Sequence, residues 1–290
     1  MPLMGRGREY SRARGVAEWL LACAYRGAWA RTVADAHPGS RDATLRRVPI
    51  ALKSAPRGFR MRVAVMSDLH AGPTTSPRAL AGSFRLVRGA APDLVLFGGD
   101  YVWLEARYVE ELVDEIGSLA APLGKLAVMG NHDLWADDAH IRRALESAGA
   151  RVLVNESAAA GGLQVVGIDD PWTGVMDAGA AFQDVDERAP VVVLCHAPEV
   201  LSALGPRRFD VLVCGHTHGG QVCRPPGVPI YVPGPIGRKY PGGRYELDGG
   251  ATAIISRGVG TVEFPFRAWC RPEVLLLELS AAADAASAPV

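Results

Sequence analysis

The sequence predicts an α/β fold, and three observations from residue 48 onwards indicate it. Short apolar runs recur, and glycine or polar residues follow most of them, which is typical of buried strands. Between them lie segments with apolar residues at helical spacing, which is typical of helices that cover a sheet. Polar side chains follow five of the runs directly, at the carboxyl ends of strands where open α/β sheets bind ligands.

Six apolar runs have the length and composition of buried strands. They are MRVAVM (61–66), DLVLF (93–97), KLAVM (125–129), LQVVGI (163–168), VVVLC (191–195) and VLVC (211–214). Two later strands are expected near 251–256 and 273–279, beyond a stretch rich in proline and glycine that begins near residue 222.

Three helices are expected between these strands. The first opens at Ser76-Pro77, because serine caps a helix and proline suits its first turn. The second follows from apolar residues at i, i+3, i+4 and i+7, and the third starts near Asp137 and stops at Gly149. The apolar faces are Leu80, Phe84 and Val87; Val109, Leu112, Val113 and Ile116; and Ile141 and Leu145.

Composition limits the classes of partner and compartment. The 290 residues carry no formal net charge, so no strongly basic surface for nucleic acid is indicated. The five cysteines include no CxxC pair, and Cys195 and Cys214 end apolar strands. We therefore expect reduced, buried cysteines and a cytoplasmic protein.

The chain divides into three expected parts: an arginine-rich segment at 1–48 with an amphipathic helix over 15–36, a catalytic domain at 49–280, and an alanine-rich tail at 281–290. Glu18 and Arg26 interrupt the apolar residues of the first part, so a membrane-spanning helix is not expected there. Two interpretations of that helix stay open. It packs against the domain, or it lies in the interface of a membrane, peripherally at the inner face.

Histidine and acidic residues gather after five of the expected strands. Five of the seven histidines occupy these positions. Any one of them alone has a structural explanation, such as a turn or a helix cap, but five strand ends with the same chemistry point to one site. The residues are Asp68 and His70; Asp100; Asn131, His132 and Asp133; His196; and His216 and His218.

Carboxylates, imidazoles and an amide oxygen form a mixed ligand set that suits Mn, Fe, Zn or Ni better than calcium or magnesium. There are more candidates than one tetrahedral zinc ion needs. The sequence therefore predicts two divalent transition-metal ions.

The motifs DLH, GD, GNHD, a lone H and GHTH, in this order, resemble the calcineurin-like metallophosphoesterase signature over residues 58–280. The resemblance implies a sandwich of two mixed β-sheets flanked by helices. It assigns Asp68, His70 and His218 to one metal, Asn131, His196 and His216 to the other, and Asp100 to both. The segments GHTHGGQV, GRKYPGGRYELDGG and SRGVGTVEFPFRAWCRPEVLLLEL are similar to the YkuE/YaeI-type bacterial branch, whose members are phosphodiesterase-like and often membrane-tethered.

One position departs from the family pattern. Many members read GDxxD, but GDYVW places Trp103 where the second carboxylate would stand. That carboxylate commonly orients the histidine of GNH. Asp133 or Asp170 is therefore expected to orient His132, or the ring is held less firmly.

The resemblance implies hydrolysis of a phosphate ester, most simply a phosphodiester, by a hydroxide that bridges the two metals. His132 is the expected general acid for the leaving group; a structural role beside the site is the alternative. Three other functions stay open: a UDP-2,3-diacylglucosamine pyrophosphohydrolase of lipid A synthesis, a phosphomonoesterase, and a non-catalytic scaffold. The scaffold is disfavoured because every expected ligand is present.

The stretch 222–245 follows the GHTH motif directly and has two open interpretations. It forms a rim over the site, where Arg238, Lys239 and Tyr240 contact the substrate, or it is a solvated loop.

Overall fold

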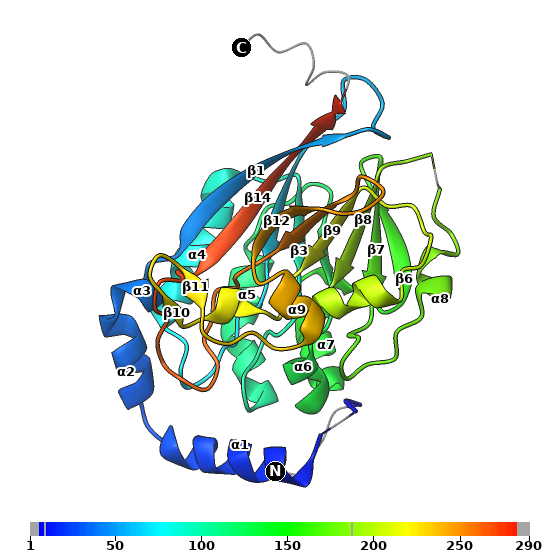
Figure 1. Cartoon of the computed structure of the whole chain (residues 1–290). Helices are drawn as coiled ribbons and strands as arrows, with labels where there is room; N and C mark the ends of the chain where they lie inside the picture. Colours follow the sequence, from blue (N-terminus) through cyan, green and yellow to red (C-terminus); the bar gives the residue numbers. More distant parts are fainter. Residues whose placement is uncertain (1–5, 9, 187, 283–290) are drawn as a thin grey trace.

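Two six-stranded β-sheets face each other in the computed structural model, which describes residues 6–8, 10–186 and 188–282 (Figure 1). The first sheet has the order β1-β14-β2-β3-β4-β5. In it β1 runs parallel to β14, β14 runs antiparallel to β2, and the remaining pairs are parallel. Its strands are β1 Thr44–Leu52, β2 Arg60–Met66, β3 Leu94–Phe97, β4 Lys125–Ala127, β5 Ala150–Val152 and β14 Glu273–Ala281.

The second sheet has the order β12-β13-β9-β8-β7-β6, with a parallel centre and an antiparallel strand at each edge. A short antiparallel ribbon, β10 Cys223–Arg224 and β11 Val228–Pro229, stands apart from both sheets. The strands of the second sheet are β6 Glu156–Ala160, β7 Leu163–Ile168, β8 Val191–Cys195, β9 Val211–Cys214, β12 Gly243–Glu246 and β13 Thr252–Ile255.

Alternation along the strands produces three apolar layers. In β2, Val63 and Val65 point into the core between the sheets, while Ala64 and Met66 point to the helices outside. In β9, Val211 and Val213 likewise join the central core, and the alternate residues join an outer core on the other side. Because side chains alternate with a period of two, each sheet buries both faces.

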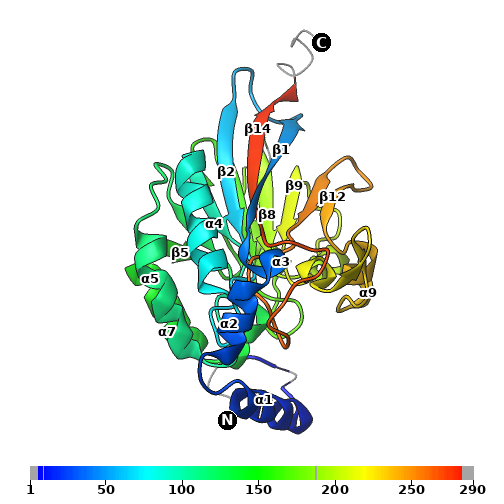
Figure 2. The same ribbon diagram turned by 90° about the vertical axis from the view of Figure 1, so that its left-hand side faces the viewer.

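Helices cover the two outer faces, so the layers run helix, sheet, sheet, helix (Figure 2). Residues of α4 Pro77–Ala90, α5 Glu110–Gly117 and α7 Asp138–Ser147 pack on the first sheet. The second sheet carries α8 Ala178–Phe182 and the short helix η2 Pro198–Ser202. The predicted sandwich of two mixed sheets is confirmed.

Further short helices lie in the loops. They are η1 Ala106–Val109, α6 Asn131–Trp135, η3 His218–Gly220 and α9 Pro235–Lys239.

The first 36 residues include two helices, α1 Arg12–Ala24 and α2 Trp29–Ala36, before the short α3 Pro38–Arg41. We refer to residues 6–36, without the undescribed residue 9, as the N-terminal arm. Helix α1 lies across the end of the molecule to which β2 and the parallel strands beside it lead (Figures 1 and 2). Among the described residues, no helix combines the length and apolar character that crossing a membrane requires.

The expectation of one helix over 15–36 is wrong in detail. The helix breaks after Ala24, where Tyr25 turns into a buried cluster and Gly27 takes a positive φ of 82°. Left-handed backbone costs glycine little, so the chain redirects there.

The division of the chain at residue 48 stays a prediction, although β1 runs through that point. Most of the expected tail, residues 283–290, lies outside the described residues. The strand expected at 125–129 ends at Ala127, and Cys195 and Cys214 are free and buried, as expected. The prediction did not include the edge strands β1, β5, β6 and β12. Their burial patterns mix exposed and buried positions, so their sequences lack the continuous apolar run that marks a central strand.

Candidate metal centre

Five loops, each leaving the carboxyl end of a strand, bring the seven expected ligands together. Asp68 and His70 follow β2, Asp100 follows β3, and Asn131 begins α6 after β4. The second sheet supplies three more from the ends of β8 and β9. The site therefore lies where the two sheets meet at one edge, and each sheet contributes to it. The residues from the second sheet are His196, His216 and His218.

Asp68, His70 and His218 form the first group. One donor atom from each lies within 4.8 Å of the others. His218 Nε2 is 3.1 Å from His70 Nε2 and 3.4 Å from Asp68 Oδ1. All three side chains are buried, so these atoms face one another with little access to solvent.

Asn131, His196 and His216 form the second group, with Asp100 between the groups. His216 Nδ1 lies 2.9 Å from Asn131 Oδ1 and 3.3 Å from His196 Nε2. The same carboxylate oxygen, Asp100 Oδ2, is 3.1 Å from His196 Nε2 and 3.4 Å from His70 Nε2. Asp100 therefore touches both groups, as a bridging ligand would.

Backbone carbonyls select the tautomers of two of these histidines. His70 Nδ1 lies 3.3 Å from the carbonyl of Val102, and His196 Nδ1 lies 2.7 Å from that of Gly98. Because a carbonyl only accepts, each Nδ1 must carry the proton, and in the neutral ring Nε2 is left with a lone pair. Both lone pairs point into the site, which is how a metal-binding imidazole is usually held.

Five of the seven expected ligands have left-handed backbone. Their φ angles are positive although none is glycine, a conformation that costs free energy and that packing or function must offset. Such conformations gather at functional sites. The φ angles are 52° for Asp68, 41° for His70, 56° for Asp100, 68° for His216 and 53° for His218.

Two glycines let these loops approach one another closely. A Cβ atom on Gly215 would overlap Ser67 and the carboxylate of Asp68, and one on Gly130 would overlap the carboxylate of Asp100. The glycines of GNHD and GHTH are therefore required by close packing around the carboxylates.

Burial sets the charge states in the protein without metal. It lowers the pKa of His70 to about 4 and that of His216 to about 3, so both rings are neutral near pH 7. Burial also raises the pKa of Asp68 to about 6. Burial alone would raise the pKa of Asp100. The neighbouring His196 and His132 lower it by more, so the pKa of Asp100 lies well below its usual range. For His196 burial lowers the pKa, but Asp100 raises it by more, to well above its usual range, so a cation must displace the proton of this ring. Neutral imidazoles and an ionised carboxylate are the forms that bind cations.

The residues fit divalent cations. Asp68 Oδ2 is buried and has no hydrogen-bond partner among the described residues. A buried carboxylate oxygen without a partner is costly, and so is a cluster of imidazole nitrogens whose lone pairs face each other. Cations coordinated by these atoms would remove both costs.

His132 lies at the border of the site and is partly exposed. Its ring packs at right angles to His70, with 4.9 Å between centroids, and against Trp135 at 5.3 Å. Its backbone N–H donates to Asp100 Oδ1 at 2.9 Å. Burial lowers the pKa of His132 well below its usual range, although Asp100 raises it.

Neither carboxylate expected to orient His132 contacts its ring. Asp133 accepts backbone N–H groups from Gly130, Asp100 and Tyr101 at 2.8–2.9 Å, so it shapes the loops instead. Asp170 accepts from Trp172 and Thr173. Among the described residues, edge-on contacts with the rings of His70 and Trp135 hold the imidazole.

Trp103 replaces the missing carboxylate with an anchor for the N-terminal arm. Its ring is 1% exposed and packs edge-on against Tyr25, 5.6 Å between centroids, in a cluster with Ala30. The position at which the family pattern led us to expect a second carboxylate therefore fixes the arm in this chain.

Sequence analysis missed Trp135 and Arg267. Trp135 follows His132 by three residues, a helical spacing that places the two rings together. Arg267 is fully buried and its guanidinium lies 3.3 Å from both the carbonyl and Nδ1 of His218. No local signal marks Arg267, because 49 residues separate it from His218.

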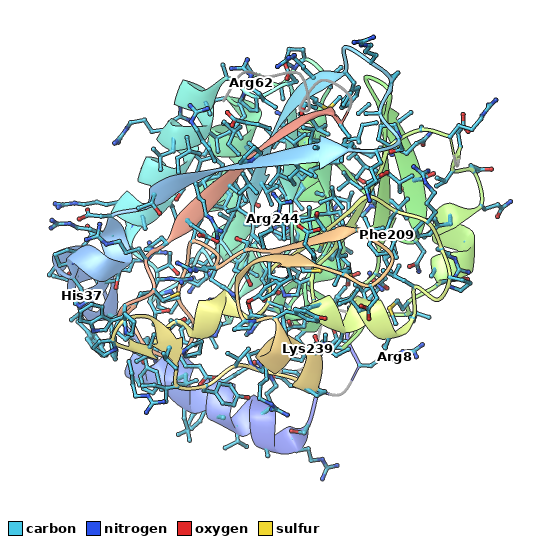
Figure 3. The ribbon with its side chains drawn as sticks, turned by 45° about the horizontal axis from the view of Figure 1, so that its top comes forward. Arg8, His37, Arg62, Phe209, Lys239 and Arg244 are labelled. Carbon is cyan, nitrogen blue, oxygen red and sulfur yellow. The ribbon has the colours of Figure 1, made fainter. Side chains whose placement is uncertain are left out.

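Arg238 and Lys239 end α9, and Tyr240 follows it directly. Figure 3 labels Lys239. Arg238 and Lys239 are exposed, and Lys239 Nζ lies 5.1 Å from the centroid of the Tyr240 ring. Helix α9 itself is close to the site, since the N–H of Gly237 donates to Glu199, three residues beyond His196. Contact of the three side chains with substrate stays a prediction.

Comparison with known proteins adds independent evidence. The family model for calcineurin-like phosphoesterases matches residues 61–220. "Uncharacterized metallophosphoesterase YkuE" of Bacillus subtilis is 28% identical over 77% of this chain and 81% of its own length. "Phosphodiesterase YaeI" of Escherichia coli is 30% identical over 75% of this chain and 82% of its own.

A solved structure has a fold similar to that of this chain. The 5'-nucleotidase precursor of Thermus thermophilus matches 70% of this chain and 50% of its own, with a TM-score of 0.46 and 18% identity.

Proposed function

Because the chain belongs to the calcineurin-like phosphoesterase family, we propose that this phosphoesterase hydrolyses a phosphodiester with the help of two divalent metal ions. One observation carries the proposal: a single oxygen, Asp100 Oδ2, lies between the imidazoles of His70 and His196. The relative named a phosphodiesterase supports the choice of a diester over a monoester.

We assign one metal to Asp68, His70 and His218, the other to Asn131, His196 and His216, and Asp100 to both. When bound, two divalent ions supply four positive charges against two carboxylates, attract the phosphate and lower the pKa of a coordinated water. Mn, Zn, Fe and Ni all suit this ligand set. The chain itself fixes the tautomers and the spacing of the donor atoms.

His132 is assigned to the leaving oxygen. Its ring is partly exposed at the border of the buried cluster, so it is the histidine that a substrate reaches. Without substrate, the lowered pKa of His132 favours its neutral ring. A phosphate anion bound beside it would favour the protonated ring, which can then pass its proton to the departing alkoxide. Arg238, Lys239 and Tyr240 are kept as proposed contacts of the substrate at the rim.

The test is metal reconstitution with a matched pair of substrates. Protein stripped with a chelator would be reloaded separately with Mn, Zn, Fe and Ni, and hydrolysis of bis(p-nitrophenyl) phosphate compared with p-nitrophenyl phosphate. Two metal ions per chain and a preference for the diester are expected. A preference for the monoester would select the phosphomonoesterase, and metal binding without turnover of either ester or of a UDP-linked diphosphate would select the scaffold.

Contact with a membrane surface through residues 15–36, at the inner face in the cytoplasm, also stays a proposal. The exposed apolar side chains of α1 motivate it: Val16, Trp19 and Leu20 are 59%, 56% and 55% exposed. Co-sedimentation with anionic liposomes, comparing the whole protein with a Trp19→Ser, Leu20→Ser variant, tests it. Equal binding by both proteins would rule out this contact.

A further inference from the structure

A cavity of about 490 Å³ lies beside α1, and His132 forms part of its wall. Helix α1 and Tyr10, just before it, form one side. The opposite side comes from the loop before η1, from η1 and α6, and from the start of α7. The cavity therefore lies directly beside the proposed proton donor. Helix α1, which forms one of its sides, crosses this end of the molecule (Figure 2).

The lining is largely apolar. Trp19 and Ala22 contribute from α1, and Leu104, Ala106 and Trp135 contribute from the facing side. The Trp135 ring is fixed by the arm, because the Arg14 guanidinium stacks 3.6 Å from its centroid.

The charged groups of the lining already have partners. Glu18 accepts from Tyr10 and Arg14 at 2.6 and 2.9 Å. Arg107 pairs with Glu105 at 3.0 Å. Asp137 caps α7, and His140 lies 3.1 Å from Glu110. The two guanidiniums at the lining, Arg107 and the Arg14 group over Trp135, are both paired with carboxylates, so neither is free to bind a second phosphate.

We infer that this cavity binds the leaving group of the substrate and that this group is an uncharged, apolar alcohol. The inference rests on the proposed phosphoesterase function, because the alcohol must leave from the side of His132. An alkyl or aryl group attached to that oxygen extends into the cavity, and burial against the tryptophans favours it. A nucleotide leaving group would bring its phosphate against the carboxylates, so the UDP-linked diphosphate is disfavoured.

The experiment uses three diesters of equal intrinsic reactivity: methyl phenyl, methyl 4-butylphenyl and methyl 4-octylphenyl phosphate. An alkyl substituent hardly changes the acidity of a phenol, so differences in kcat/KM report binding of the alkyl chain. Each buried methylene group is worth up to about fourfold. We expect kcat/KM to rise at least about tenfold from phenyl to butylphenyl.

Two variants change the cavity and one serves as a control. Ala22→Phe fills the cavity and Trp19→Ala removes its wall, so both should bring the butylphenyl to phenyl ratio of kcat/KM close to one. Leu20→Ala alters an equally exposed apolar residue of α1 that does not line the cavity, and it should keep the wild-type ratio. Circular dichroism checks that all three variants fold.

Calorimetric measurement of the binding of free 4-butylphenol tests this inference separately from the proposed phosphoesterase function. Turnover of all three esters with a ratio near one, together with 4-butylphenol binding that Ala22→Phe leaves unchanged, would overturn the inference and leave the phosphoesterase intact. Absence of all turnover, with 4-butylphenol binding that Ala22→Phe abolishes, would overturn the function and support the cavity as an alcohol site.

Discussion

The metal centre and the N-terminal arm differ in how strongly the fold determines them. The centre draws its side chains from five loops of two sheets, buries them and holds five of them in left-handed backbone. Helix α1 of the arm has no buried residue. The contact of Arg14 on Trp135 holds α1 itself, and contacts on either side of it hold the chain, chiefly Tyr25 on Trp103 and Arg6 on Asp169.

The difference shows that one site can combine a rigid part and an adjustable part. The donor atoms need fixed spacing, and strained backbone persists only where many contacts surround it. Helix α1, on the side of the cavity that faces His132, has no buried residue, and segments with few buried contacts open at low cost. The two regions meet at His132 and Trp135, so changes on either side test whether they are independent.

Loss of Asp100 should have the largest effect, because its carboxylate touches both groups of the centre. Asp100→Asn is expected to lower kcat/KM by about 10³-fold, which corresponds to several kcal/mol of lost electrostatic stabilisation. Metal content by mass spectrometry should fall below two ions per chain. Asp248→Asn, an exposed carboxylate in a turn, is the control and should change neither quantity.

Replacement of His132 should separate chemistry from metal binding. His132→Ala is expected to lower kcat by about 10²–10⁴-fold while metal content stays at the wild-type value. Metal analysis and turnover are measured on the same sample. Unchanged turnover would mean that the ring only fills space between His70 and Trp135.

Release of the arm should leave the centre intact. Tyr25→Ala removes an aromatic ring from the cluster with Trp103. The arm should lose about 3 kcal/mol of stabilisation, which raises the population of the open arm about 10²-fold. Limited proteolysis within residues 6–36 should become correspondingly faster. Loss of bound metal in this variant would show that the arm and the centre are one cooperative unit.

Removal of each metal ion should destabilise the centre by a smaller amount. At a metal concentration of about 100 times Kd, each bound ion contributes about 2.7 kcal/mol, or about 4–5 °C in Tm for a chain of this size. Differential scanning fluorimetry with and without a chelator measures it. Asp100→Asn should show little of this shift.

The smallest effect is expected at Arg6, whose guanidinium bonds to Asp169 at 2.6 and 2.8 Å and to Asp138. Arg6 is partly exposed, and Asp169 also accepts backbone N–H groups from Asp170 and Val175. Arg6→Gln should therefore lower the free energy of arm closure by about 1 kcal/mol or less, and salt should reduce the difference. Proteolysis rates at two ionic strengths provide the measurement.

The central strands and the clustering of the ligands were predictable because both depend on local patterns. Apolar runs mark β2, β3, β7, β8 and β9, and polar residues directly after five strands mark the site. The partner of Trp103 was not predictable, because Tyr25 lies far away in sequence and joins it only through tertiary packing. The break in the amphipathic helix depends on the same contact, since Tyr25 must turn inward.

The place of β14 has a consequence for synthesis of the protein. This strand lies between β1 and β2 and pairs with both, over nine residues of β1. A nascent chain halted before residue 273 already carries every expected ligand, yet its β1 has no neighbour and an open edge faces the solvent. The first sheet can be completed only after the ribosome has translated residues 273–281, and until then its unpaired strand edges are open to pairing with other chains.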